Sequence, residues 1–160
     1  MTPAVLHVNG GTVPLDPDGP ALLVEFLRND LGLKATRFGC GLEQCGACMV
    51  LVDGVPTHSC SRRAAEFAGR AVTTVEGLSA GGLHPLQQAL IDEQAGQCGF
   101  CLSGILISGV ALLAANPVPS RAEIVAALDG HLCRCGVQPR VVAAVERAAA
   151  ELERRRGDAA

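Results

Sequence analysis

The chain has 160 residues, of which 49% are hydrophobic and 2% are aromatic, and its formal net charge at pH 7 is −3. This hydrophobic content suffices for a packed core, so the sequence predicts a globular protein. The mild acidity excludes a basic nucleic-acid-binding surface, and without Trp or Tyr the chain lacks the stacking surface of single-strand binders.

The N-terminal residues Met1–His7 contain no basic segment followed by a long apolar run, so we expect no secretory signal. The longest apolar run, 100–115, is shorter than the roughly 20 residues of a membrane span and predicts a buried helix instead. Cytoplasm is therefore the default location, and export together with a signal-bearing partner stays open. Eight cysteines in such a chain indicate metal or redox chemistry rather than a disulfide framework.

In chain order, the first half predicts strands joined by tight turns and one amphipathic helix. A hairpin turns at Asn9-Gly10-Gly11, and a helix begins at Pro20 and ends at Gly32. Further short strands are expected at Met49–Val52, Val55–Ser59 and Ala71–Val75. Together they predict a small mixed sheet crossed by one helix, the arrangement called a β-grasp.

The second half carries helical patterns only. We expect helices over 85–95 and 100–115, a third helix capped by Ser120 and Glu123, and a fourth over 138–155. His84 is a candidate cap for the first of them, and Gly104 and Gly109 would let another helix approach the second closely. The prediction is thus an α+β chain with a β-grasp domain over 1–77, a small four-helix bundle over 84–156 and a flexible tail over 157–160.

The most informative stretch is Gly39–Cys48, where three cysteines have the spacing C-x4-C-x2-C. A fourth cysteine follows twelve positions later, which is the ligand spacing of a plant-type 2Fe-2S cluster. The candidate ligands are Cys40, Cys45, Cys48 and Cys60. Glycines at 39, 41 and 46 allow the backbone to approach an inorganic cluster closely.

The other four cysteines form a C-x2-C pair and a C-x-C pair in the helical half: Cys98, Cys101, Cys133 and Cys135. The first pair is expected at the start of the buried helix and the second between the third and fourth helices, so both can meet at one end of the bundle. On spacing alone they could hold a structural zinc ion. Beside a complete first motif, a second 2Fe-2S cluster is the simpler interpretation.

These motifs resemble the two-cluster 2Fe-2S subunits of molybdenum hydroxylases, the group of xanthine dehydrogenase, aldehyde oxidoreductase, nicotinate dehydrogenase and isoquinoline oxidoreductase. The resemblance rests on Cys40–Cys48, on His84-Pro-Leu-Gln-Gln, on Gln97-Cys-Gly-Phe-Cys and on Leu132-Cys-Arg-Cys-Gly, and it covers nearly the whole chain. Two residues depart from the common pattern: Phe100 replaces a frequent tyrosine, and His131 a frequent asparagine.

The resemblance implies an electron-transfer subunit with no catalytic residue of its own. A partner chain would hold the molybdenum-pterin cofactor, contacted by Gln97 and Cys135 next to the second cluster. The first cluster would pass electrons to a flavin subunit or a cytochrome. Leu102-Ser-Gly, where purine-oxidising relatives tend to have Thr-Pro-Gly, favours an N-heteroaromatic substrate over aldehydes and purines.

Other interpretations of these residues are weaker. Glu43 and Asp53 lie in tight loops without a paired carboxylate, and His58 and His131 are expected to be ordinary polar residues rather than Rieske-type ligands. Arg37 and Arg134 flank cysteine motifs and could tune a cluster by their charge. The functional alternatives are a free-standing ferredoxin, which would need only the first domain, and a zinc-binding interaction module.

Overall fold

The first element is the predicted hairpin, seen in a computed structural model that describes residues 4–158. Strand β1 (Val5–Val8) pairs antiparallel with β2 (Gly11–Pro14). Asn9 and Gly10 have φ values of 50° and 83°, the left-handed conformations that a two-residue hairpin turn of this type requires. The hairpin predicted from the local Asn-Gly signal is therefore confirmed.

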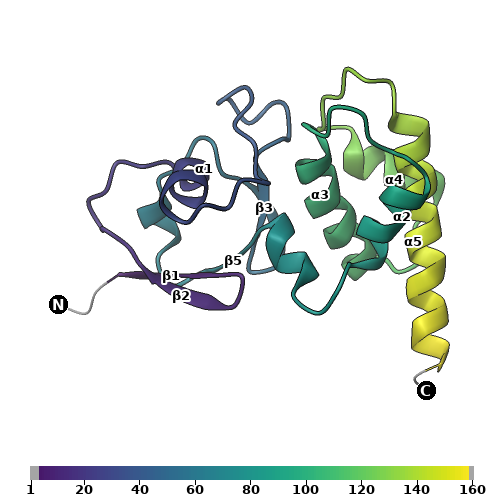
Figure 1. The fold of residues 1–160 in the computed structure, drawn as a ribbon, viewed down its shortest axis with the longest axis horizontal. Helices are drawn as coiled ribbons and strands as arrows, with labels where there is room; N and C mark the ends of the chain where they lie inside the picture. Colours follow the sequence, from purple (N-terminus) through teal and green to yellow (C-terminus); the bar gives the residue numbers. More distant parts are fainter. Residues whose placement is uncertain (1–3, 159–160) are drawn as a thin grey trace.

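The hairpin belongs to a mixed sheet of five strands in the order β2-β1-β5-β3-β4 (Figure 1). Strands β3 (Met49–Val52) and β4 (Val55–His58) form a second hairpin. Strand β5 (Ala71–Thr73) lies between the hairpins, parallel to β1 and antiparallel to β3. Short 3-10 turns η2 (Ala64–Phe67) and η3 (Val75–Ser79) flank β5. This is the predicted β-grasp arrangement.

The helix that packs on this sheet begins later than predicted. Helix α1 (Leu23–Glu25) continues as a wider turn, η1 (Phe26–Asp30), closed by a bond from Leu31 N–H to Phe26 O at 3.1 Å. The predicted start at Pro20 was wrong because the backbone at 21–23 instead pairs with the segment 62–64. Leu23 and Leu27 are fully buried against sheet residues.

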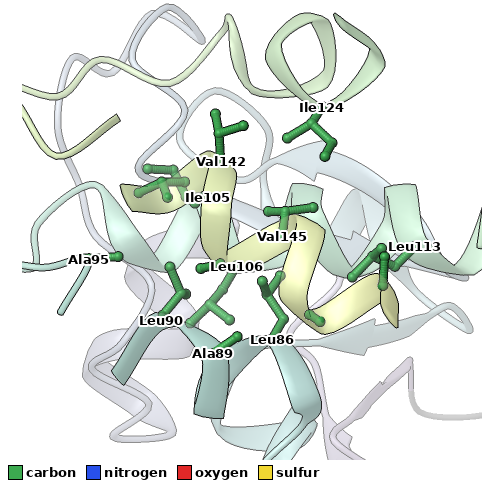
Figure 2. Close-up of a cluster of buried hydrophobic side chains, with 14 of the residues drawn as sticks. Leu86, Ala89, Leu90, Ala95, Ile105, Leu106, Leu113, Ile124, Val142 and Val145 are labelled. Carbon is green, nitrogen blue, oxygen red and sulfur yellow. The ribbon is translucent and has the colours of Figure 1, made fainter. Parts of the chain in front are cut away.

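Four helices form the second half: α2 (Pro85–Asp92), α3 (Leu102–Ala115), α4 (Arg121–Leu128) and α5 (Gln138–Asp158). Figure 2 shows their shared core, in which Leu86 and Leu90 of α2 meet Ile105 and Leu106 of α3 and Val145 of α5. Ile124 joins α4 to the same core. The predicted four-helix bundle is confirmed.

The helix ends follow local capping chemistry. The Nδ1 atom of His84 accepts the Leu86 N–H at 3.1 Å, and the Ser120 hydroxyl accepts the Glu123 N–H at 3.3 Å, so both predicted caps are present. Helix α5 continues to Asp158, so 157–158, predicted as part of a tail, are helical. The other two tail residues, 159–160, lie outside the described residues, and none of the helices within 4–158 has the length and apolar character needed to cross a bilayer.

Helix α3 packs against β3 and so joins the two halves (Figure 1). A Cβ at Gly109 would lie 2.6 Å from Leu86 of α2, the close helix approach that was predicted. A Cβ at Gly104 would instead lie 1.9 Å from the carbonyl oxygen of Gly46. The prediction for Gly104 was therefore wrong in the partner: the close neighbour is the first cysteine loop.

Candidate metal centres

The first cysteine loop connects η1 to β3 and contains Cys40, Cys45 and Cys48; Cys60 follows β4. Cys48 and Cys60 are buried side by side with exposed fractions of 1% and 2%, whereas Cys40 is exposed. The Ser59 hydroxyl donates to Cys48 O at 2.6 Å and so ties the loop to the end of β4. The four thiols thus form an inner pair, Cys48 and Cys60, and an outer pair, Cys40 and Cys45.

Backbone N–H groups converge on the outer pair. Leu42 N–H and Gln44 N–H both donate to Cys40 Sγ at 3.3 Å, and Cys40 N–H donates to Cys45 Sγ at 3.4 Å. These donors lower the pKa of the Cys40 thiol to about 7 because they stabilise the thiolate. The loop is therefore built to hold negative charge on sulfur.

Glycines make this wrapping possible. Gly41 and Gly46 have φ values of 69° and 71°, which disfavour any residue with a Cβ. A Cβ at Gly39 would lie 2.7 Å from Cys45 Sγ, closer than real Cβ contacts come. These are the three glycines at which the sequence predicted a close approach of the backbone to the cluster.

The second set of cysteines lies where the sequence predicted, before α3 and between α4 and α5. Cys135 Sγ lies 3.5 Å from Cys98 Sγ, and burial raises the pKa of Cys101 to about 12, with the neighbouring Cys133 thiol adding to the rise. Cys98 is exposed and Cys101 is buried. An outer pair, Cys98 and Cys135, and an inner pair, Cys101 and Cys133, are thus found here too.

Two pairs of thiols at each site fit a 2Fe-2S cluster better than a zinc ion. Structural zinc takes four ligands around one ion. Within residues 4–158, no three His, Cys, Asp or Glu side chains are grouped around a position for a single metal ion. In a 2Fe-2S cluster the four cysteines are shared between two irons, so two thiolates per iron are sufficient.

The two cysteine loops are joined directly by hydrogen bonds. Leu132 N–H, next to Cys133, donates to Cys45 O at 3.1 Å. The buried Ser103 hydroxyl, two residues after Cys101, donates to Ala47 O at 3.1 Å. Each bond connects a residue beside a second-set cysteine to the first loop, and periodicity or spacing alone did not reveal either.

His131 also lies at this junction, although the sequence analysis treated it as an ordinary polar residue. Its Nε2 atom lies 2.8 Å from Ser108 Oγ of α3. A Cβ at Gly46 would lie 2.2 Å from its Nδ1 atom, so the ring sits directly on the first cysteine loop. Burial lowers the pKa of His131, which keeps the ring neutral near pH 7.

The remaining candidates are exposed beside the second motif or have local structural partners. Gln97 is exposed beside Cys98, and Arg134 is exposed between Cys133 and Cys135. Asp53 accepts the Ala71 N–H at 2.8 Å and pairs with Arg70, and these contacts lower its pKa. Glu43 accepts the Ser61 hydroxyl. Both carboxylates thus stabilise the turns in which they lie.

Phe100 lies between the two sites. Its side chain is 47% exposed, and its ring lies 3.5 Å from the position of a Cβ on Gly39. The residue that departs from the family's frequent tyrosine therefore reaches from the second motif to the first cysteine loop.

Comparison with known proteins gives a consistent assignment. A family model described as a 2Fe-2S iron-sulfur cluster binding domain matches residues 6–74, and one described as a [2Fe-2S] binding domain matches residues 74–146. An iron-sulfur chain of similar size, from the nicotinate dehydrogenase of Pseudomonas putida, is 49% identical over 93% of this chain and 96% of that protein. The alpha chain of isoquinoline 1-oxidoreductase of Brevundimonas diminuta is 48% identical over 84% and 87%.

Solved structures agree with this. Quinoline 2-oxidoreductase from Pseudomonas putida 86 contains a chain that superposes with a TM-score of 0.87 at 37% identity, covering 96% of both chains. The aldehyde oxidoreductase of Desulfovibrio desulfuricans superposes with a TM-score of 0.88 at 41% identity, over 96% of this chain but 17% of that one. The same fold thus occurs both as a chain of this size and within a much longer chain.

Proposed function

Because this chain belongs to the two-cluster iron-sulfur subunits of the molybdenum hydroxylase family, we propose that it conducts electrons from a molybdenum-pterin site on a partner chain to a separate acceptor. When bound, each 2Fe-2S cluster takes up and releases electrons at a potential set by its hydrogen bonds and exposure. The protein's contribution is to hold the two clusters, shield them and fix their spacing.

We assign the eight cysteines as the ligands. Cys40, Cys45, Cys48 and Cys60 hold the first cluster, and Cys98, Cys101, Cys133 and Cys135 hold the second. The division of each set into an inner and an outer pair supports one pair on each iron. The N–H groups at Leu42 and Gln44 stabilise charge on the exposed side of the first cluster.

The exposed side of each site suggests the direction of transfer. Gln97 and Cys98 are exposed at the second site, next to Cys135, and we assign Gln97 and Cys135 as the contacts to the pterin. Cys40 is exposed at the first site, where we place the next acceptor, a flavin subunit or a cytochrome. The chain would then have an entry face on the bundle and an exit face on the β-grasp half.

The observation that carries this proposal is the bond from Leu132 N–H to Cys45 O. From Cys133, the covalent path runs through the Leu132 backbone to its amide, crosses one 3.1 Å hydrogen bond and reaches Cys45. No gap across a flexible side chain interrupts it. A diffusible carrier with one cluster would need no such connection, which disfavours the free-standing ferredoxin.

For the substrate of the partner chain we propose an N-heteroaromatic ring. Relatives that match over most of their own length are named for nicotinate, isoquinoline and nicotine. Leu102-Ser103-Gly104 after Cys101 agrees with this group. Aldehydes are the second candidate, because the iron-sulfur-binding chain of an Escherichia coli aldehyde oxidoreductase is 38% identical.

The test is a measurement of iron, acid-labile sulfide and zinc on the purified native complex, together with its reduced electron paramagnetic resonance spectrum. We expect about four irons and four sulfides per chain and two distinguishable signals. A large molybdenum-containing chain should copurify, and a nicotinate-like substrate should bleach the clusters. Two irons with zinc, or two irons without a partner, would contradict the proposal.

A further inference from the structure

His131 makes contacts with all three segments that carry the cluster cysteines. It lies two residues before Cys133, its ring packs on Gly46 between Cys45 and Cys48, and its Nε2 atom bonds to Ser108 of the helix that follows Cys101. The segments come from distant parts of the chain. One side chain therefore fastens them together.

Contacts on both sides hold the ring in place. Added Cβ atoms at Gly46 and at Gly104 would lie 2.2 and 2.9 Å from Nδ1, so the first loop and α3 both reach the ring with bare backbone. Nδ1 is buried there and has no hydrogen-bond partner among residues 4–158. The ring thus acts as a spacer of fixed size, anchored at its other end by Ser108.

The backbone around His131 is held equally firmly. His131 N–H donates to Leu128 O at 3.0 Å, which continues the end of α4, and the next amide, Leu132 N–H, donates to Cys45 O. Moving the ring would therefore move the one backbone bond that joins the two cysteine loops. Ser108 itself is 7% exposed, so few rearranged positions are open to the pair.

We propose that His131 is a positioning residue that sets the separation and orientation of the two clusters, through its bond to Ser108 and its contact with Gly46. This rests on the proposed function, since it requires both clusters. It assigns no electron-carrying role to the imidazole. Ring volume and the Ser108 bond are the two properties that matter.

Variants of the native complex separate these properties. His131→Leu keeps a side chain of similar size but loses the bond, Ser108→Ala removes the bond from the other side, and His131→Gln keeps an amide that can reach Ser108. His7→Ala is the control, because His7 is exposed on the edge hairpin and bonds only to Thr12 nearby. Each complex is first assayed for iron.

The decisive readout is the magnetic interaction between the two reduced clusters in the electron paramagnetic resonance spectrum. Dipolar coupling falls with the cube of the separation, so it reports cluster geometry independently of turnover. We expect His131→Leu and Ser108→Ala to keep their iron and lose the wild-type splitting or broadening, while His131→Gln and His7→Ala retain it.

Hydrogen exchange provides a second readout. The Leu132 amide should exchange faster in His131→Leu and Ser108→Ala, whereas the amide of Asn9, bonded to Val72 O at 3.0 Å in the sheet, should be unchanged. Both effects are local to the junction. Faster exchange throughout the chain would indicate general destabilisation and would contradict a positioning role.

The outcomes separate this inference from the proposed function. Full iron with an unchanged magnetic interaction in His131→Leu and Ser108→Ala overturns the inference and leaves the function intact. Should His131→Leu lose iron, Ser108→Ala decides, since it removes a single oxygen atom. A wild-type complex with only one cluster would overturn both.

Discussion

Gly104 of helix α3 lies so close to Gly46 of the first cysteine loop that a Cβ on Gly104 would come within 1.9 Å of the Gly46 carbonyl oxygen. Both sides of this contact are backbone, so neither can move aside by a change of rotamer. The two halves of the chain meet here without any side chain between them. This contact brings the start of α3, and with it Cys101, next to the first loop.

Gly104→Ala should therefore destabilise the protein. Alanine in a helix gains about 1 kcal/mol over glycine in open space, but overpacking against backbone costs about 1–3 kcal/mol, and we expect the clash to win. Gly109→Ala in the same helix is the matched control, because its nearest neighbour is the movable end of the Leu86 side chain. Thermal unfolding of the holoprotein should show a lower Tm for Gly104→Ala than for Gly109→Ala, and equal values would refute the prediction.

Single cysteine variants should remove one cluster each. We expect Cys135→Ser to lose about half of the iron and to keep the signal of the first cluster, and Cys40→Ser to show the reverse pattern, because each set of four ligands is complete by itself. Iron analysis and electron paramagnetic resonance check this. Loss of both signals in both variants would indicate that the cysteines do not divide into these two sets.

The cap of α2 should make stability depend on pH. Nδ1 of His84 accepts the Leu86 N–H only when the ring is neutral, and burial, followed by the charge of Arg155, lowers the pKa of His84. The folded chain therefore binds this proton less readily than the unfolded chain. The contribution of the cap is complete above about pH 6.5 and is lost as pH falls through the lower folded pKa.

His84→Asn is the variant that isolates this effect, since asparagine caps a helix without titrating. At neutral pH the two proteins should have similar unfolding free energies. Below the folded pKa the wild type should be less stable than His84→Asn by about 1 kcal/mol, the usual value of a cap. Urea unfolding along a pH series checks this, and a difference that does not change with pH would count against it.

Features set by neighbours in the sequence could be predicted. The spacing of Cys40, Cys45 and Cys48 defines a loop of fixed length, Asn9-Gly10 supplies its own turn, and Ser120 with Glu123 caps a helix from within four residues. Each of these depends on chemistry inside a short window. For the same reason the eight cysteines could be proposed as ligands before any coordinates were considered.

Features set by distant segments could not. The delayed start of α1 depends on pairing with Arg62 and its neighbours, and the role of Gly104 depends on a loop some sixty positions earlier. His131 carried no local signal beyond its departure from a common asparagine. Its contacts with Ser108 and Gly46 exist only because α3 packs against β3.

The last prediction concerns Gln97, whose side chain is exposed beside Cys98. If it contacts the pterin of the partner chain, Gln97→Ala should leave cluster assembly intact, because no described hydrogen bond within residues 4–158 depends on its side chain. Iron content and the spectrum after chemical reduction should match the wild type. Reduction of the clusters by substrate should be slower, since the connection to the molybdenum site is weakened.

Stopped-flow bleaching of the clusters separates these steps. Gln88→Ala is the matched control, because Gln88 is also an exposed glutamine but lies on α2 with its side chain bonded to Asp92. A slower substrate phase with an unchanged dithionite phase in Gln97→Ala alone would support the contact. Equal substrate phases in all three proteins would place the entry of electrons elsewhere on the bundle, and the assignment of Cys135 as the neighbouring contact would then lose its main support.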